Sequence, residues 1–554
     1  MQVLTRRGFM LSAGAVALAP AHAFGEQTNV ITKAGASASP DFAADVEINL
    51  ICQRDVVSIL KGAPTRVWRY AGELVKGPEN TLTPVAGAYL GPTLRFVKGQ
   101  KIRIRLKNDL PEDTIAHWHG LHVPMAADGH PSAAIAPGAS YVYEFELRNR
   151  ASMNFYHPHT HEATATQVYR GLAGLIMVAD EEERALGLPG GEFEIPLVIQ
   201  DRTFDQDNQL LYGGGMHRDM FGFYGDVILV NGRPDYRLEV ASRAYRLRLL
   251  NASNARIYKL AWDDGSPLTI IGNDGGLLEK PETRRYVMLA PSERIDLWVD
   301  FSGRAVGAQM TMRSLGFSGL VPSMAMGMSG DDDGVESFPV FNVVVTRAMS
   351  DSPKLPDHLT PIRRYRREDL ANPDTPRPIA ITMSHMRMSL NADEYGHGAI
   401  QPNERVPVDS VQLIEIFHDH GGMGHGMGHG MGRGMGMGGP GRGMGMGGMG
   451  MGGGMMGPGM GMMGMMSMAH PIHLHGQQFQ ILERAFDGDA DSRATYSDGF
   501  VDSGWKDTVL VAPGERVTIA KPFGDFKGRF MYHCHNLEHE DMGMMREFSV
   551  ERSL

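Results

Sequence analysis

The residues with the clearest chemical potential lie near the C-terminus, where five metal-binding side chains fall between positions 533 and 544. They are His533, Cys534, His535, His539 and Met544. Thiol, thioether and imidazole groups are soft or intermediate ligands, which suit copper better than calcium or magnesium. One thiolate, two imidazoles and a long axial thioether make a blue-copper electron-transfer site. We therefore interpret Cys534 as the thiolate, His539 as one imidazole and Met544 as the axial sulfur.

A strand through Cys534 would connect this site to a second one. Neighbouring residues in a β-strand point to opposite faces. His533 and His535 would therefore face away from the Cys534 sulfur, toward another metal site behind the strand. An electron that reaches Cys534 would then have a covalent route to that second site.

Three further motifs fit the second site: His117-Trp-His119-Gly, His157-Pro-His159 and His470-Pro-Ile-His473-Leu-His475-Gly. The His-x-His spacing puts both side chains on one face of a strand, where they can share a metal cluster. One such pair is weak evidence for a metal, because most single histidines are surface or core residues. Four clusters together with a Cys-His-Met set are specific.

The four motifs, in this order, resemble those of the three-domain multicopper oxidases, which include laccases, bilirubin oxidases and bacterial copper efflux oxidases. The resemblance implies four copper ions per chain, and every ligand position of the family is filled. It implies a type 1 copper on His470, Cys534, His539 and Met544, a type 2 copper on His117 and His473, and a type 3 pair on His119, His157, His159, His475, His533 and His535. It gives no metal role to His122, His130 and His161, which we expect to be structural.

Two acidic residues match positions that serve proton transfer in related oxidases: Asp128, nine residues after His119, and Glu540, next to His539. Reduction of dioxygen to water consumes protons, so such groups are expected near the cluster. A structural, salt-bridged carboxylate is an equally good account of Asp128, because such pairs also perturb carboxylates. Glu540 is the stronger candidate.

The rest of the chain predicts an all-β protein. Short alternating runs such as 101–106, 141–146, 245–250, 294–299 and 508–511 recur between Gly, Pro, Asn and Asp, which is typical of sandwiches or barrels. The family resemblance implies three cupredoxin-like Greek-key domains, which we put at residues 45–182, 190–348 and 376–554, with a linker at 349–377. The ligands come from the first and third domains only. We therefore expect the cluster at their interface, with the middle domain as a spacer.

Residues 421–468 are almost wholly glycine and methionine and hold 17 of the chain's 38 methionines. We expect a flexible loop. Thioethers select Cu(I), and the segment ends two residues before His470, although low-complexity expansion in a tolerant loop is an alternative. Copper efflux oxidases carry a methionine-rich insertion at an earlier position of the third domain. Their acidic substrate-copper residues have no clear match here, so we assign substrate Cu(I) to Met466, Met468, Met383 and Met388.

Composition is consistent with an exported enzyme. The chain has 554 residues and a formal charge of −11 without a basic patch, which argues against a nucleic-acid partner. Arg6-Arg7, a short apolar stretch and Ala21-His22-Ala23 predict a twin-arginine signal at residues 1–23, export to the periplasm and no membrane anchor.

With Cys534 bound to copper, Cys52 has no partner and should be a buried apolar residue. We expect a monomer.

These features predict an oxidase that couples one-electron oxidation of Cu(I) to reduction of dioxygen to water. A laccase that oxidises phenols or arylamines is the alternative within the enzyme class. A non-catalytic periplasmic copper-binding protein is the alternative outside it, although binding alone does not require a wired cluster.

Overall fold

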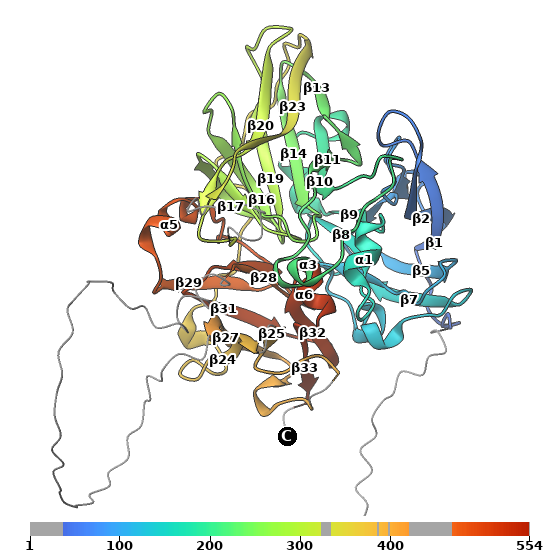
Figure 1. Cartoon of the computed structure of the whole chain (residues 1–554), viewed down its shortest axis with the longest axis vertical. Helices are drawn as coiled ribbons and strands as arrows, with labels where there is room; N and C mark the ends of the chain where they lie inside the picture. The colour runs from blue at the N-terminus through green and yellow to red at the C-terminus, as the bar shows by residue number, and fades with distance from the viewer. Residues whose placement is uncertain (1–36, 323–333, 385–386, 397–398, 420–467, 553–554) are drawn as a thin grey trace, which may run out of the picture.

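Three pairs of β-sheets make up the body of the molecule (Figure 1). The computed structural model describes residues 37–322, 334–384, 387–396, 399–419 and 468–552. The predicted export signal and all of the methionine-rich segment except Met468 lie outside the described residues. The prediction of an all-β fold is confirmed, and the five runs predicted as strands fall in β5, β7, β14, β19 and β30.

The first sheet pair comes from residues 46 to 179 and consists of sheets β2-β1-β5-β7 and β3-β4-β9-β8-β6. Its strands are β1 (Val46–Val57), β2 (Thr65–Lys76), β3 (Leu82–Thr83), β4 (Thr93–Val97), β5 (Lys101–Asn108), β6 (Ala116–His119), β7 (Ser140–Glu146), β8 (Ser152–Pro158) and β9 (Gly174–Ala179). Strand β5 shows how alternating residues give a strand one buried face: Ile102, Ile104 and Leu106 are fully buried and alternate with basic residues. Cys52 is buried in the same core, as predicted.

The second pair comes from residues 194 to 347, with sheets β12-β11-β10-β14-β19-β16-β17 and β13-β23-β20-β15-β18. Its strands are β10 (Glu194–Arg202), β11 (Val227–Val230), β12 (Arg233–Pro234), β13 (Arg237–Ala241), β14 (Ala244–Asn251), β15 (Tyr258–Trp262), β16 (Leu268–Asn273), β17 (Gly276–Arg284), β18 (Val287–Leu289), β19 (Arg294–Asp300), β20 (Gln309–Ser314) and β23 (Phe338–Arg347). A small hairpin, β21 (Phe317–Ser318) with β22 (Gly334–Val335), adds to this region.

The third pair comes from residues 377 to 551, with sheets β25-β24-β27-β31-β29 and β26-β33-β32-β28-β30. Its strands are β24 (Arg377–Ser384), β25 (Arg387–Leu390), β26 (Arg405–Pro407), β27 (Ser410–Asp419), β28 (His470–Leu474), β29 (Gln480–Phe486), β30 (Thr508–Val511), β31 (Glu515–Phe523), β32 (Gly528–Cys534) and β33 (Met545–Glu551). Each sheet pair falls within one of the three predicted ranges, and the exact domain limits stay predictions.

The helices are short and lie between the sheet pairs. They are α1 (Thr164–Tyr169), α2 (Glu181–Ala185), α3 (Met216–Phe221), α5 (Ala490–Ala494) and α6 (Leu537–Asp541). In the part of the chain that the structure describes, none is long and apolar enough to cross a membrane. Helix α6 packs against α1 and α3, which follow strands of the first and second pairs (Figure 1).

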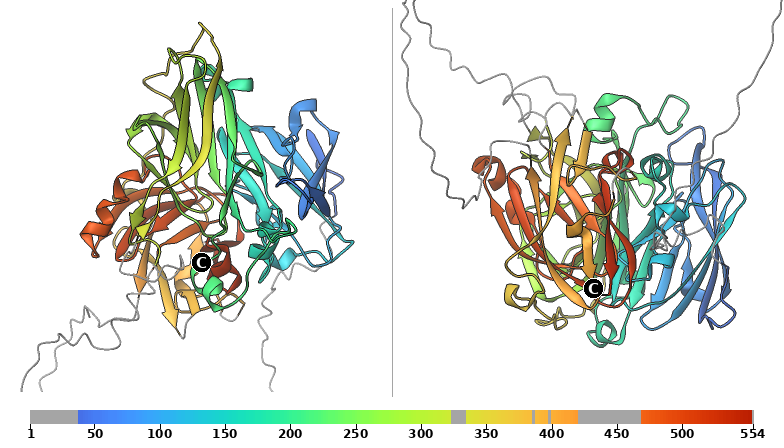
Figure 2. Two further views of the ribbon diagram at one scale, coloured as in Figure 1. Left: turned by 45° about the horizontal axis from the view of Figure 1, so that its top comes forward. Right: turned by 90° about the horizontal axis from the view of Figure 1, so that it is seen from below.

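The first and third sheet pairs lie side by side, with the second pair above them in Figure 1. The view from below in Figure 2 shows the same neighbours, blue to cyan beside orange to red. Hydrogen bonds join the two pairs directly: the Asp541 carboxylate accepts from the backbone N–H groups of Thr164 and Ala165, at 2.9 and 3.0 Å. The interface predicted to hold the metal cluster therefore exists.

Candidate metal centre

Cys534 lies at the end of β32, with a histidine on each side of its sulfur. The Nδ1 atoms of His470 and His539 lie 3.5 and 3.8 Å from Cys534 Sγ, and the two rings are 5.1 Å apart. Met544 is fully buried in the same apolar cluster as Cys534, and its carbonyl accepts from the Cys534 N–H at 3.0 Å. The structure thus brings together all four residues predicted for the type 1 site.

His539 presents an unprotonated nitrogen to the sulfur. His539 Nε2 donates to the Met220 carbonyl at 2.9 Å, and burial lowers the pKa of His539 to about 4, so its Nδ1 carries a lone pair. Burial raises the pKa of the Cys534 thiol, so a thiolate in this place needs a cation beside it. Two buried imidazoles and one buried thiolate are the donor set of a cupredoxin copper.

Strand geometry separates this site from a second one. Residues His470 and Ile472 of β28 share one face, and Ile472 is paired with Cys534 of β32. His473 lies on the opposite face and is paired with His533. One sheet therefore carries a sulfur site on one face and histidines on the other, as predicted from the order of residues around Cys534.

Eight histidines gather between that second face and the first sheet pair. In the first sheet pair, β6 and β8 place His117 opposite His157, while His119 and His159 follow the alternation. The cluster members are His117, His119, His157, His159, His473, His475, His533 and His535, all buried. The rings interleave across the interface: His117 stacks on His475 at 3.9 Å, and His119 stacks on His473 at 3.7 Å. The predicted type 2 and type 3 residues are thus neighbours, four from the first sheet pair and four from the third.

The hydrogen bonding of three of these histidines leaves lone pairs facing one another. His475 Nδ1 donates to Asp128 Oδ2 at 2.8 Å, and His533 Nδ1 faces the Cys534 carbonyl at 3.1 Å. In the neutral rings the lone pairs then sit on the Nε2 atoms, which are 3.2 Å apart. His159 Nε2 lies 3.2 and 3.3 Å from the same two atoms. Converging lone pairs need a cation between them, so this arrangement fits a bound metal.

Other ring nitrogens support the same conclusion. On the other five histidines of the cluster, six buried ring nitrogens have no hydrogen-bond partner within the described residues: His117 Nε2, His119 Nδ1, His157 Nε2, His473 Nε2 and both nitrogens of His535. Burial, followed by the neighbouring His473, lowers the pKa of His119 well below its usual value, so the ring stays neutral. Neutral imidazole is the form that binds copper.

The two predicted acids contact the cluster from different sides. Asp128 is fully buried. Its carboxylate accepts from His475, and its backbone carbonyl accepts from His117 Nδ1 at 2.6 Å. Glu540 of α6 is also buried, with Oε2 3.1 Å from His533 Nδ1 and Oε1 3.5 Å from His159 Nδ1. Asp128 therefore fixes the outer nitrogens of two cluster histidines, an arrangement that orients metal ligands, while Glu540 lies close to the outer nitrogens of two others.

We expect Asp128→Asn to weaken metal binding by the histidine cluster. The amide keeps the size of the side chain but removes the charge that accepts from His475. Loss of such a partner typically lowers metal affinity or activity by about 10- to 100-fold. The measurement is the copper-to-protein ratio after dialysis against a graded chelator. A wild-type ratio across the whole series would contradict this role.

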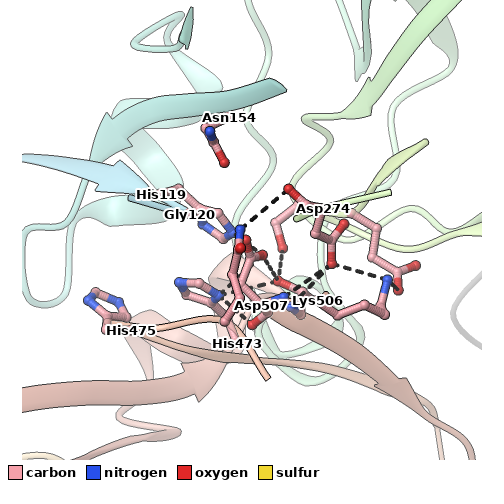
Figure 3. Close-up of polar contacts among 12 residues, drawn as sticks. His119, Gly120, Asn154, Asp274, His473, His475, Lys506 and Asp507 are labelled. Atoms are coloured by element: carbon pink, nitrogen blue, oxygen red, sulfur yellow. Dashed lines mark hydrogen bonds and ion pairs between the residues drawn. The ribbon is translucent and has the colours of Figure 1, made fainter. Parts of the chain in front are cut away.

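Several residues at the site were not found from the sequence. Asp507 lies before β30 and approaches the cluster between His119 and His473 (Figure 3). The Met220 carbonyl of α3 accepts from His539 Nε2, and the His418 ring lies 5.5 Å from the His470 ring. None belongs to a metal-binding motif. Asp507, a lone acid before the apolar strand Thr508–Val511, is the only one whose local pattern offered a signal.

The methionines predicted to bind substrate Cu(I) are partly described. Met468 is buried and shares an apolar cluster with the half-buried Met383, which lies opposite Met388 in the β24–β25 register. Met466 lies outside the described residues. The three histidines predicted to be structural stay outside the cluster: His130 Nε2 pairs with Glu547 at 2.7 Å and His122 Nε2 with Asp525 at 2.8 Å, while His161 lies on the surface.

Comparisons with known proteins agree with this geometry. Residues 68–183 and 460–553 match family models described as multicopper oxidase. The multicopper oxidase mco of Staphylococcus aureus is 29% identical over 87% of this chain and 86% of its own length. A laccase of Bacillus subtilis (strain 168) is 28% identical over 88% of this chain and 90% of its own.

A solved structure extends the match to the fold. The McoA multicopper oxidase 2F4 variant from the hyperthermophile Aquifex aeolicus is 30% identical, with a TM-score of 0.71, and the alignment covers 92% of this chain and 97% of that one. The predicted cupredoxin-like fold is confirmed, and the chain belongs to the multicopper oxidase family.

Proposed function

We propose that this protein oxidises Cu(I) and couples the oxidation to reduction of dioxygen to water. Four Cu(I) ions would supply four electrons, and four protons would complete two water molecules. Bound copper would supply one-electron transfer beside Cys534 and dioxygen reduction among the eight histidines. The remaining tasks fall to the chain itself: to bring the reductant to Cys534, to connect the two sites and to deliver protons.

The observation that carries the choice of Cu(I) is the attachment of the methionine-rich segment (residues 421–468). Strand β27 ends at Asp419, just before the segment, and its His418 ring lies 5.5 Å from the His470 ring. The chain returns at the buried Met468, two residues before His470. Both ends of a segment with 17 methionines therefore adjoin the Cys534 site. Thioethers select Cu(I) over harder cations, which supports Cu(I) as the reductant.

The route between the two sites is the backbone of β32 around Cys534. His533 and His535 are bonded neighbours of Cys534, and their rings lie among the histidines of the second site. All three side chains are buried, so water is excluded along the route. A short, covalent and dry connection suits electron transfer from the sulfur to the cluster.

Asp128 and Glu540 are the proposed groups that hold and move protons. Each carboxylate adjoins the outer nitrogen of a cluster histidine, and each lies within the protein rather than on its surface. A positioned acid must be within hydrogen-bond reach of the site it serves. Glu540 is the better placed of the two, because it lies between His159 and His533.

We also propose that the protein works in the periplasm after export through the twin-arginine pathway. Arg6-Arg7 and Ala21-His22-Ala23 support this, with a short apolar stretch between them. A compartment exposed to external copper is where oxidation of Cu(I) would serve copper tolerance.

Oxidation of phenols or arylamines is the second candidate. It is favoured by the 28% identity to a Bacillus subtilis protein named laccase. A purely copper-binding role is the third. The two histidines bonded to Cys534, whose rings lie in the cluster, favour catalysis instead, because storage needs no electron route between the sites.

Deletion of residues 421–465 should separate the first two candidates. The deletion leaves residues 420, 466 and 467 to connect Asp419 with Met468. We expect Cu(I) oxidation at low copper concentration to fall, since the capturing thioethers are lost, and oxidation of bulky phenols to rise, since the residues attached beside His470 are removed. Initial rates of oxygen consumption with each reductant measure both effects.

The matched control replaces the methionines of the segment by leucine. This keeps apolar bulk but removes the sulfur, so Cu(I) oxidation should fall without much gain toward phenols. Unchanged Cu(I) kinetics in both variants would contradict the role of the segment and leave phenol oxidation as the better account.

A further inference from the structure

The middle sheet pair reaches the histidine cluster through one arginine. Arg294 opens β19, and its side chain is only 1% exposed. Its guanidinium holds the Asp507 carboxylate with two bonds, Nη1 to Oδ1 at 2.7 Å and Nη2 to Oδ2 at 2.5 Å. Such a fork fixes both the position and the plane of a carboxylate.

Asp507 in turn contacts one cluster histidine from each of the other two sheet pairs (Figure 3). Its Oδ1 accepts from His119 Nε2 at 3.1 Å, and its backbone carbonyl accepts from His473 Nδ1 at 2.8 Å. These bonds place the ring protons on the outer nitrogens. His119 Nδ1 and His473 Nε2, which lack hydrogen-bond partners, are left for the metal.

The remaining contacts of Arg294 hold it rigidly between three regions of the chain. It donates to the Met153 carbonyl at 3.1 Å in the first sheet pair, and to the Ser292 and Asp274 carbonyls at 2.9 and 3.1 Å in the second. Lys506, beside Asp507, forms ion pairs with Asp274 and Glu293 of the second pair, at 3.1 and 3.0 Å. The buried junction therefore holds two cations and three carboxylates, and each cation is paired across the interface.

The glycine of the His-Trp-His-Gly motif lies where there is no room for a side chain, beside the Arg294–Asp507 ion pair. Gly120 has φ +88°, and a Cβ atom there would lie closest to Asn154 Oδ1, then 2.8 Å from Arg294 Nη2 and 3.0 Å from Asp507 Oδ2. Any larger residue would clash with Asn154 and with the fork. The position after His119 is thus shaped to admit the arginine of another domain.

The cluster of His119, His473 and Asp507 could also be taken for an additional metal site, since their ligand atoms lie within 4.8 Å of one another. The arginine argues against that reading. Both Asp507 oxygens are engaged by a cation already, and a second cation would be repelled. Asp507 is an orienting group rather than a ligand.

We propose that Arg294 is a positioning residue for the copper cluster: acting through Asp507, it fixes the tautomer and ring orientation of His119 and the position of His473. This rests on the assignment of the eight histidines to copper. On this proposal the middle domain is more than the spacer predicted from the sequence, because it supplies the group that orients ligands from both others.

The test compares Arg294→Met with Arg246→Met in the copper-loaded protein. Arg246 is a matched control: it is equally buried in the adjacent strand β14 and holds Asp296 through bonds of 2.6 to 3.0 Å, but contacts no cluster residue. We expect Arg294→Met to keep the blue absorption of the Cys534 site, to alter the type 2 electron paramagnetic resonance signal and to bind cluster copper about 10- to 100-fold more weakly.

Arg246→Met should lower the melting temperature of the copper-free protein but leave the type 2 signal unchanged. Arg294→Lys keeps the charge and loses the fork, so it should fall between wild type and Arg294→Met. If Arg294→Met does not fold, Asp507→Asn takes its place with the same expectations. A wild-type copper ratio and type 2 signal in the Arg294 and Asp507 variants would overturn the proposal, and so would an equal spectral change in Arg246→Met. Wild-type protein that binds no cluster copper would instead overturn the function on which it rests.

Discussion

Replacing Cys534 by serine should abolish the blue colour of the copper-loaded protein and reduce turnover by roughly four orders of magnitude or more, the scale seen when a member of a catalytic unit is removed. Serine offers a hard oxygen where copper prefers a soft sulfur. The change removes thiolate-to-copper charge transfer and the covalent route to His533 and His535. Visible absorption and oxygen consumption on the same sample measure both losses.

The second cysteine supplies the control. Cys52 is as deeply buried as Cys534 but lies in the core of the first sheet pair. Cys52→Ser should therefore keep its colour and turnover, whatever it does to stability. The type 3 absorption of Cys534→Ser should survive, since the eight histidines are untouched. A Cys534→Ser protein that stays blue would show that the thiolate has been misassigned.

Replacing Glu540 by glutamine should slow reoxidation of the fully reduced protein by dioxygen by about 100-fold or more, because a positioned proton donor contributes on that scale. Glutamine keeps the size and the hydrogen-bonding capacity but cannot titrate. The copper-to-protein ratio should stay at the wild-type value, since Glu540 adjoins the outer ring nitrogens of His159 and His533 and not those that face the metal. Stopped-flow mixing of reduced protein with dioxygen measures the rate.

Glu538 on the same helix is the matched control for that experiment. It is also buried, but its oxygens accept from Tyr212, Asn254 and the Phe223 N–H, at 2.6, 2.8 and 3.1 Å. Glu538→Gln removes an equal charge from α6 without touching a cluster histidine. Equal slowing in both variants would mean that the helix charge, and not a proton path through Glu540, sets the rate.

The order of neighbouring residues in the sequence was enough to predict the fold class and the two kinds of metal site. Strand alternation is a property of consecutive residues, so the opposite orientation of Cys534 and its two histidine neighbours could be predicted from three positions. The same holds for the His-x-His pairs and for the strand runs such as 101–106. These predictions needed no knowledge of what the strands pack against.

What could not be predicted depends on partners far apart in the chain. Arg294 meets Asp507 across 213 residues, and Asp128 meets His475 across 347. A local pattern can single out one of these acids but not its partner, since any buried acid or arginine beside a strand has the same local pattern. For the same reason Glu540 could be named as a proton-transfer candidate, but not the histidines that it contacts.

The most direct test of the account is the number of electrons consumed per dioxygen molecule, measured with a limiting pulse of Cu(I) in an oxygen-electrode cell that also detects peroxide. Electron transfer from Cys534 to the histidine cluster and complete reduction there predict four Cu(I) oxidised per dioxygen, with no peroxide. Two Cu(I) per dioxygen with peroxide accumulating would contradict it, because the eight histidines would then not hold a cluster that completes the reduction to water.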